Sequence, residues 1–209
     1  MILIGQYDSP FVRRVGIALT LYGLEFEHRP WSTFGDADKI RPYNPLTRVP
    51  TLVLDDGEVL IESHSILDHL DSLVPRAKAL FPAEGRARRD ALKIAALATG
   101  AADKAVSLFY ETRLHAQAST VWVQRCRGQI AGVLAALESD RAARPGDYWF
   151  DGRIGHCDIA VAAMLRFVGE AHAGTVPLAG FPALGAHAAR LEATPAFQKI
   201  SQNFIPPSS

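Results

Sequence analysis

The order of strand-like and helix-like segments changes near residue 75, and this change restricts the chain to few folds. Before that point, apolar runs predict strands at Ile2–Gln6 and Leu24–Arg29, with a helix between them that starts at Pro10. The stretch RVPTLVLDDGEVLIE is typical of two strands joined by a tight turn at Asp55-Asp56-Gly57. The segment SHSILDHLDSLVP predicts a closing helix with Ser63 as its N-cap. The first part of the chain therefore has the order βαβ-ββα.

After this unit the sequence predicts helices only. The segment PRAKALFPAEG, with two prolines and a glycine, is typical of a linker, and no strand pattern follows Arg86. The helical patterns cover roughly 87–116, 118–143, 156–170, 182–192 and 195–202. The predicted fold class is α/β plus all-α: an α/β domain at 1–75, a linker at 76–86 and a helical-bundle domain at 87–209.

One helix start in the second half carries a detailed folding signal. In IGHCDI, Gly155 is expected at the N-cap, and the Asp158 carboxylate can reach back to the Gly155 N–H. Ile154 and Ile159 stand at the two positions that pack together across a helix start. We interpret this pattern as a signal for folding rather than for catalysis.

Composition argues against several classes of function. Lys plus Arg and Asp plus Glu number 22 each, so no net field attracts nucleic acid or an anionic membrane. The short basic group Arg86, Arg88 and Arg89 is interpreted as a solvated helix start. Cys126 and Cys157 form neither a disulfide framework nor a metal-binding CxxC pair, which fits a reducing compartment. Without a leader peptide or an apolar stretch near ~18 residues, we expect a cytoplasmic protein, and no motif indicates a metal, a nucleotide or a serine hydrolase.

The junction YDSPFVRRVGIAL places a serine where a strand turns directly into a helix. Ser9 is a favourable N-cap, and Pro10 suits the first helical position. The first turn of a helix exposes unpaired N–H groups and a partial positive charge, which stabilise an anion. A thiolate is such an anion, and a serine hydroxyl can donate a hydrogen bond to its sulfur. Taken alone, this segment favours the simpler interpretation, that Ser9 only caps the helix and Pro10 only starts it.

Two further segments indicate a ligand with several polar groups. In NPLTRVPTL, a cis Val49–Pro50 bond would turn the Val49 N–H and C=O outward, where they could pair with another extended backbone. In IESHSI, Ser63 and the N–H groups of a helix start suit a carboxylate, and Glu62 suits an ammonium group. A small thiol peptide with an amine and a carboxylate at one end would match all three places. Each place also has an ordinary explanation, as a trans proline or a helix cap.

In combination, SPFVRRVGIAL, NPLTRVPTL, IESHSI and GHCDIA resemble the cytosolic glutathione S-transferase superfamily over nearly the whole chain. The resemblance implies a thioredoxin-like first domain and an all-helical second domain, and SPFxxRV is most similar to the serine-type branch. It implies that Ser9 contacts the glutathione sulfur, that Pro50 is cis and that Val49 pairs with the cysteinyl backbone. The other implied glutathione contacts are Glu62 and Ser63 at the γ-glutamyl end, Arg48 near the glycyl carboxylate and Phe11 beside the serine.

The implied activity is glutathione transfer. Ser9 would stabilise the glutathione thiolate with help from the helix dipole, and a thiol pKa lowered by two units corresponds to roughly 2.7 kcal/mol. The thiolate would then attack a small hydrophobic electrophile in a neighbouring pocket. Tyr7 is the rival for the sulfur contact, because other branches of the family use a tyrosine at the end of the first strand. Since neither cysteine lies near the first helix, thiol–disulfide exchange through an enzyme cysteine is disfavoured.

The electrophile pocket is less defined by the sequence. Near the first domain, Tyr7, Phe11, Trp31 and Phe34 are aromatic candidates. On the predicted helix 87–116, polar side chains recur at helical spacing and face either the cleft between the domains or the solvent. These side chains are Thr99, Asp103, Ser107 and Tyr110, with Arg113 one turn beyond them.

Two other functions stay compatible with the sequence. One is a non-catalytic binding or regulatory protein that keeps the glutathione fold. The other is a glutathione-dependent lyase, isomerase or dehalogenase, which begins from the same thiolate. The resemblance also implies a homodimer, and the two long alanine-rich helices offer more apolar surface than one small domain needs. Glutathione is the expected co-substrate, and we expect no metal, nucleic acid or membrane as a partner.

Overall fold

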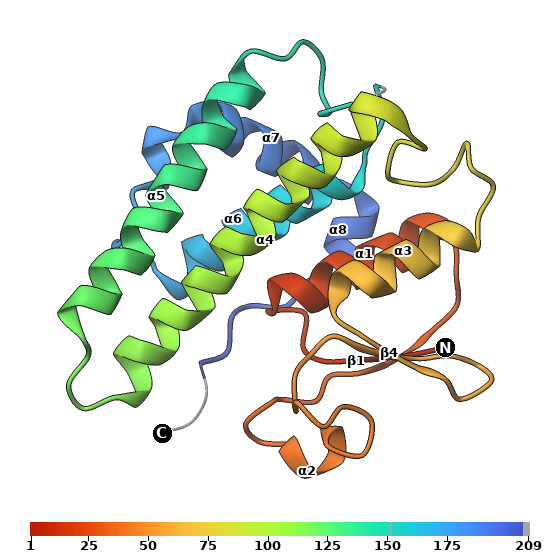
Figure 1. Cartoon of the computed structure of the whole chain (residues 1–209), viewed down its shortest axis with the longest axis horizontal. Helices are drawn as coiled ribbons and strands as arrows, with labels where there is room; N and C mark the ends of the chain where they lie inside the picture. Colours follow the sequence, from red (N-terminus) through yellow and green to blue (C-terminus); the bar gives the residue numbers. More distant parts are fainter. Residues whose placement is uncertain (151, 207–209) are drawn as a thin grey trace.

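The computed structural model describes residues 1–150 and 152–206; Asp151 and residues 207–209, which belong to the predicted helical domain, lie outside the described residues. The chain forms a four-stranded mixed sheet with its own helices, followed by a bundle of helices (Figure 1). This arrangement confirms the predicted α/β plus all-α fold class. The boundaries 1–75, 76–86 and 87–209 stay a prediction.

The sheet has the strand order β2-β1-β3-β4. Its strands are β1 (Ile2–Ile4), β2 (Glu27–Arg29), β3 (Thr51–Val53) and β4 (Val59–Ile61). β1 runs parallel to β2 and antiparallel to β3, and β3 pairs antiparallel with β4 across the predicted turn. The first two strands are shorter than predicted. Gly5 turns the chain after β1 with a φ of 127°, and the Leu24 N–H is bonded to the last turn of the preceding helix instead of a strand.

Three helices accompany the sheet: α1 (Pro10–Tyr22), α2 (Ala37–Ile40) and α3 (Ser63–Ser72). α1 and α3 lie side by side on one face of the sheet, and α2 lies beyond the other face (Figure 1). The prediction that Ser63 caps α3 was wrong by one residue. The chain turns sharply at Glu62, where φ is 66°, so that the Glu62 carbonyl accepts the Ile66 N–H and Ser63 becomes the first helical residue.

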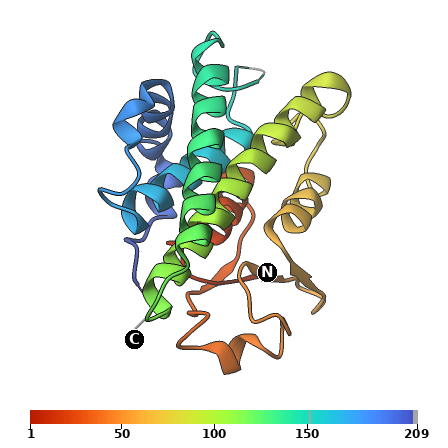
Figure 2. The same cartoon turned by 60° about the vertical axis from the view of Figure 1, so that its left-hand side comes forward.

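The second half is built from helices, as predicted. They are α4 (Gly85–Leu114), α5 (Thr120–Ala142), α6 (His156–Ala171), α7 (Pro182–Glu192) and α8 (Pro195–Lys199), with a 3-10 turn at Leu178–Gly180. α4 packs against α5 and α6, and α6 packs against α1 of the sheet domain (Figure 2). Small side chains allow the close approach of α4, and its buried alanines include Ala91, Ala95, Ala98, Ala102 and Ala105. Among the described residues, no helix is long and apolar enough to cross a membrane.

The start of α6 has the predicted geometry. The Gly155 N–H donates to Asp158 Oδ2 at 2.8 Å, and the Trp149 N–H donates to Oδ1 at 2.9 Å. Ile154 and Ile159 belong to the same hydrophobic cluster. The fully buried Asp158 carboxylate therefore joins the loop before α6 to the first turn of the helix.

An arginine of α1 joins the two halves of the chain. Arg13 is only 2% exposed, and its guanidinium binds the Glu192 carboxylate, with Nη2 donating to Oε2 at 2.7 Å. It also donates to the carbonyls of Phe197 and Ile200, in and just after α8. Through Arg13, the end of α7 and the region of α8 are tied to α1 of the sheet domain.

Candidate functional site

A cavity of about 810 Å³ lies where the sheet domain meets the helical bundle. The sheet domain supplies the loop after β1, the start of α1 and the loops on either side of α2. The helical half supplies the ends of α4 and α6 and the C-terminal segment, which passes between α4 and the sheet domain (Figure 1). Most of the apolar wall is aromatic: Phe11, Trp31, Phe34, Phe109, Tyr110, Phe167 and Phe204.

Ser9 lies in the wall of this cavity, at the N-terminus of α1. Its backbone is extended, with φ −68° and ψ 124°, and its Oγ accepts the Val12 N–H at 3.4 Å. Pro10 follows at the first helical position. Because the cap uses Ser9 Oγ as an acceptor, the hydroxyl proton is free to donate to a group in the cavity. A hydroxyl donor and the positive end of a 13-residue helix therefore meet at one point.

Tyr7 has a different environment. Its ring stacks on His28, with ring centroids 3.8 Å apart and 6° between the planes, and it also packs against Gly16 of α1. Burial raises the pKa of Tyr7 to about 12. Tyr7 is not among the described residues that line the cavity.

Val49 presents an unpaired length of backbone to the cavity. The Val49–Pro50 peptide bond is cis, as the resemblance implied. The N–H and C=O of Val49 make no hydrogen bond with any described residue, whereas Asn44 and Thr51 bind the carbonyl of Arg48 and fix the loop. An extended peptide could therefore pair with Val49 without breaking a bond of the protein.

The remaining predicted glutathione contacts lie next to this wall. Arg48 lines the cavity, and its Nη1 lies 3.4 Å from the Glu62 carboxylate in a half-exposed ion pair. Such a pair contributes little to folding, so both side chains stay available to a ligand. Ser63 is 2% exposed at the start of α3. Among the described lining residues the cavity includes Arg48 but not Pro50, Glu62 or Ser63.

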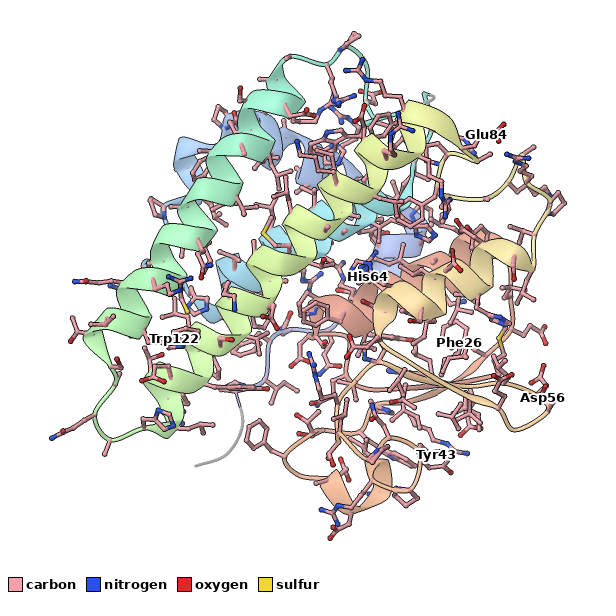
Figure 3. All side chains as sticks on the ribbon, viewed as in Figure 1. Phe26, Tyr43, Asp56, His64, Glu84 and Trp122 are labelled. Carbon is pink, nitrogen blue, oxygen red and sulfur yellow. The ribbon has the colours of Figure 1, made fainter. Side chains whose placement is uncertain are left out.

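The predicted polar stripe of α4 does not share one environment. Thr99 is buried, and its hydroxyl lies 3.2 Å from Nε2 of His64, which Figure 3 shows between α3 and α4. Tyr110 lines the cavity, where the Phe34 ring packs edge-on against it at 5.3 Å. Asp103 lies 3.4 Å from Lys104. Of the described residues that line the cavity, none is Asp103, Ser107 or Arg113.

Several residues that line the cavity were not predicted from the sequence. Asp8 precedes the site serine, and its carboxylate accepts the Ile205 N–H at 3.0 Å; burial raises its pKa. Phe204 packs edge-to-face on Phe109 and Phe167, with centroids 5.0 Å and 5.5 Å apart. The sequence gives little indication that this C-terminal segment returns to the cavity. Its one relevant feature is the apolar pair Phe204-Ile205.

The described side chains form neither a metal-binding cluster nor an exposed thiol site. Across residues 1–150 and 152–206, no group of three or more His, Cys, Asp and Glu side chains could hold a metal ion. Cys126 and Cys157 are buried, and burial raises the pKa of both thiols. Both thiols therefore stay protonated, whereas the reactive form of a cysteine is the thiolate.

Comparisons with known proteins agree with this geometry. Residues 3–78 match the glutathione S-transferase N-terminal domain, and residues 120–190 match the glutathione S-transferase C-terminal domain. A glutathione S-transferase of Methylobacterium radiotolerans, solved in complex with glutathione sulfonate, superimposes with a TM-score of 0.91. It is 29% identical, and the match covers 100% of this chain and 97% of that chain.

Two relatives indicate how far the similarity extends. YibF of Escherichia coli, described as an uncharacterized GST-like protein, is 34% identical over 139 residues, which are 66% of this chain and 68% of YibF. The maleylacetoacetate isomerase of Pseudomonas aeruginosa is 36% identical over 85 residues, which are 38% of this chain and 40% of that enzyme. Together with the fold and the two domain matches, these similarities show that the chain belongs to the cytosolic glutathione S-transferase superfamily.

Proposed function

We propose that this chain is a glutathione transferase that holds bound glutathione as a thiolate and directs it at a small hydrophobic electrophile. The observation that carries the proposal is the position of Ser9, at the start of α1 and in the wall of the cavity between the two halves. The unpaired backbone of Val49 in the same wall supports a peptide ligand. The similarity to a glutathione S-transferase solved with glutathione sulfonate supports glutathione as that peptide.

In this proposal the nucleophile belongs to the ligand. The Ser9 hydroxyl donates a hydrogen bond to the sulfur, and the helix dipole favours its negative charge. The thiol proton leaves to solvent, because a serine hydroxyl does not act as a base at neutral pH. The sulfur then forms a bond to the electrophilic carbon, and the leaving group departs with the electron pair. A thiol pKa lowered from ~8.5 to ~6.5 corresponds to about 2.7 kcal/mol of thiolate stabilisation.

The other glutathione contacts are proposals of the same kind. Val49 pairs with the cysteinyl backbone beside the cis Pro50, and Phe11 lies next to the sulfur. Glu62 takes the γ-glutamyl ammonium group, and Ser63 with the start of α3 takes the carboxylate. Arg48, which lines the cavity, is available to the glycyl carboxylate. This set is typical of the serine-type branch.

The proposed electrophile site is the aromatic part of the cavity. Phe11, Phe34 and Tyr110 form part of it, and Phe109, Phe167 and Phe204 complete it. Aromatic walls favour a planar or aromatic electrophile through ring stacking and burial of apolar surface. Tyr7, Asp103, Ser107 and Arg113 are left out of this proposed pocket, because they are not among its described lining residues.

A glutathione-dependent isomerase is the second candidate. The similarity to the maleylacetoacetate isomerase of Pseudomonas aeruginosa favours it. A lyase or a dehalogenase would begin from the same thiolate. The products separate these reactions: a transferase leaves a stable glutathione adduct, whereas an isomerase returns glutathione unchanged. A binding protein without turnover is supported if glutathione binds and no electrophile reacts.

The test is calorimetric titration of reduced glutathione, with the thiolate followed by its ultraviolet absorbance across pH. We expect Ser9→Ala to bind glutathione and to lose thiolate absorbance near neutral pH. Ser119→Ala is the matched control, because Ser119 caps α5 in the same way, accepting the Trp122 N–H at 3.3 Å. It removes an equivalent helix cap outside the cavity and leaves the thiolate unchanged. If Tyr7→Phe instead abolishes the absorbance, the sulfur contact belongs to Tyr7.

The proposal also includes a cytoplasmic homodimer. Two free, buried cysteines fit a reducing compartment. The homodimer is the assembly that the resemblance to the family implies. Light scattering coupled to gel filtration would give the mass of the particle, and a mass near 22.7 kDa would exclude the dimer.

A further inference from the structure

A second arginine of α1 is buried without a counter-charge. Arg14 is 1% exposed, and its Nε and Nη2 have no hydrogen-bond partner among the described residues. Across the described residues, its guanidinium makes one hydrogen bond, from Nη1 to Ser63 Oγ at 3.4 Å. The neighbouring Arg13 is also buried, yet it has the Glu192 carboxylate and two carbonyls as partners.

The groups around Arg14 leave its charge uncompensated. Burial lowers the pKa of His64 and of His156, and the charge of Arg14 lowers both further. Burial holds the pKa of the Cys157 thiol well above its ordinary value. These three neighbours are therefore uncharged at neutral pH. Burial lowers the pKa of Arg14 to about 10, so the guanidinium itself stays charged there.

The nearest place for an anion is the start of α3. Ser63 is the first residue of this 10-residue helix, and the first N–H groups of a helix are unpaired. A guanidinium can only donate hydrogen bonds, whereas a hydroxyl donates one and accepts two. Ser63 Oγ must therefore accept from Arg14, and its own proton must point to another acceptor.

We propose that Arg14 is a positioning residue for the anion-binding start of α3: by donating to Ser63 Oγ, it commits the Ser63 hydroxyl to donate to the carboxylate of the bound ligand. The inference rests on the proposed function, because the carboxylate is that of the γ-glutamyl group. Contacts of this kind are often long without a ligand and shorten in the complex, which fits the distance of 3.4 Å.

The test compares two ligands on each variant. One is glutathione, and the other is γ-aminobutyryl-cysteinyl-glycine, which keeps the amine and lacks the γ-glutamyl carboxylate. The ratio of their dissociation constants measures the contribution of that carboxylate. We expect Arg14→Met to reduce this ratio about tenfold, the effect of a charge-assisted hydrogen bond, and Arg14→Lys to restore part of it. In a Ser63→Ala background, Arg14→Met should change the ratio no further.

Arg13→Met is the matched control for a purely structural effect. It should lower the melting temperature, because it leaves the Glu192 carboxylate without its partner, and it should leave the ratio unchanged. Arg14→Met removes an unpaired buried charge, so it should fold at least as stably as the wild type. If it does not fold, Arg14→Leu, which also lacks a donor, carries the same comparison.

The outcomes separate the inference from the proposed function. If the wild type does not bind glutathione, the proposed function fails first. If the wild type binds glutathione and prefers it to the analogue, but Arg14→Met or Arg14→Leu keeps the wild-type ratio, the role of Arg14 is refuted. The same conclusion follows if Arg14→Met reduces the ratio equally with and without the Ser63 hydroxyl.

Discussion

Removing the carboxylate of Asp158 should destabilise the whole chain. This side chain is fully buried and accepts two backbone N–H groups, from Gly155 at 2.8 Å and from Trp149 at 2.9 Å. In Asp158→Ala both donors lose their partner at a place that excludes water. Each buried unpaired N–H costs about 1–3 kcal/mol, so we expect a loss of about 4 kcal/mol in the free energy of unfolding. For a chain of this length that corresponds to a melting temperature lower by about 8–16 °C.

Glu138→Ala provides the matched control. Glu138 also accepts two backbone N–H groups, from Ala183 and Leu184 at 2.9 Å each, but it is only half-buried. Water can replace its oxygens there, so we expect a smaller loss of about 1–2 kcal/mol. Asp158→Asn should lie between Asp158→Ala and the wild type, because its one amide oxygen can satisfy one of the two donors. Urea unfolding followed by circular dichroism, with calorimetry beside it, measures all three variants.

The burial of Asp158 also sets the sign of the pH dependence of stability. Burial, the largest cause, raises the pKa of Asp158 to about 6, against 3.8 for the ordinary group. The folded chain therefore holds this proton more tightly than the unfolded chain. The contribution is fully present below about pH 4 and is lost as pH rises through about 6, by about 3 kcal/mol in total. If Asp158→Ala loses no more stability than Glu138→Ala, or if Asp158→Asn keeps the full pH dependence, the account is refuted.

Three further perturbations test other parts of the structure. Asp71→Asn should reduce the loss of stability as pH falls below about 4, measured by urea midpoints across pH. Burial raises the Asp71 pKa, but the hydrogen bonds from His156, Tyr22 and the Phe81 N–H together outweigh it and lower the pKa; unchanged midpoints would contradict this. Cys126 and Cys157 should react slowly with a thiol reagent in the native chain and rapidly in urea, because both are buried; fast native labelling would refute the burial. Phe204→Ala should raise the KM for an aromatic electrophile and leave the Kd for glutathione unchanged, since Phe204 packs in the aromatic wall; an altered glutathione Kd alone would refute it.

Local signals in the sequence were sufficient for most of the fold. The helix over 182–192 has the predicted bounds. The Asp158 carboxylate binds the Gly155 N–H at the start of α6 as predicted, because a helix cap depends only on residues within one turn. The first two strands were predicted too long. Gly5, at positive φ, ends β1 early, and the hydrogen bond from Leu24 to α1 delays the start of β2. The shift of the α3 cap to Glu62 came from a positive φ at a non-glycine residue, which no propensity indicates.

The candidate site was predicted only where it is local. Ser9 and Val49 stand in short motifs of the first domain, and both line the cavity. Phe167 and Phe204 line the same cavity but lie far along the chain from Ser9 and Val49. Their position depends on how α6 and the C-terminal segment pack. For the same reason, the sequence could not decide whether the polar stripe of α4 faces the cavity or the solvent. Helical spacing tells which residues share a face, and it does not tell which part of a long helix faces the cavity.

The partners of Arg13 limit how this chain can exchange parts with its relatives. The charge belongs to the first half, while Glu192 and the two carbonyls that hold it belong to the last helices. A recombinant that joined this first half to a foreign helical half without a matching acceptor would bury an unpaired charge, at a cost of about 3–5 kcal/mol. That is a large share of the stability of an ordinary domain. The two halves are therefore expected to be inherited together, and successful grafts should carry the cation and its acceptor as a pair.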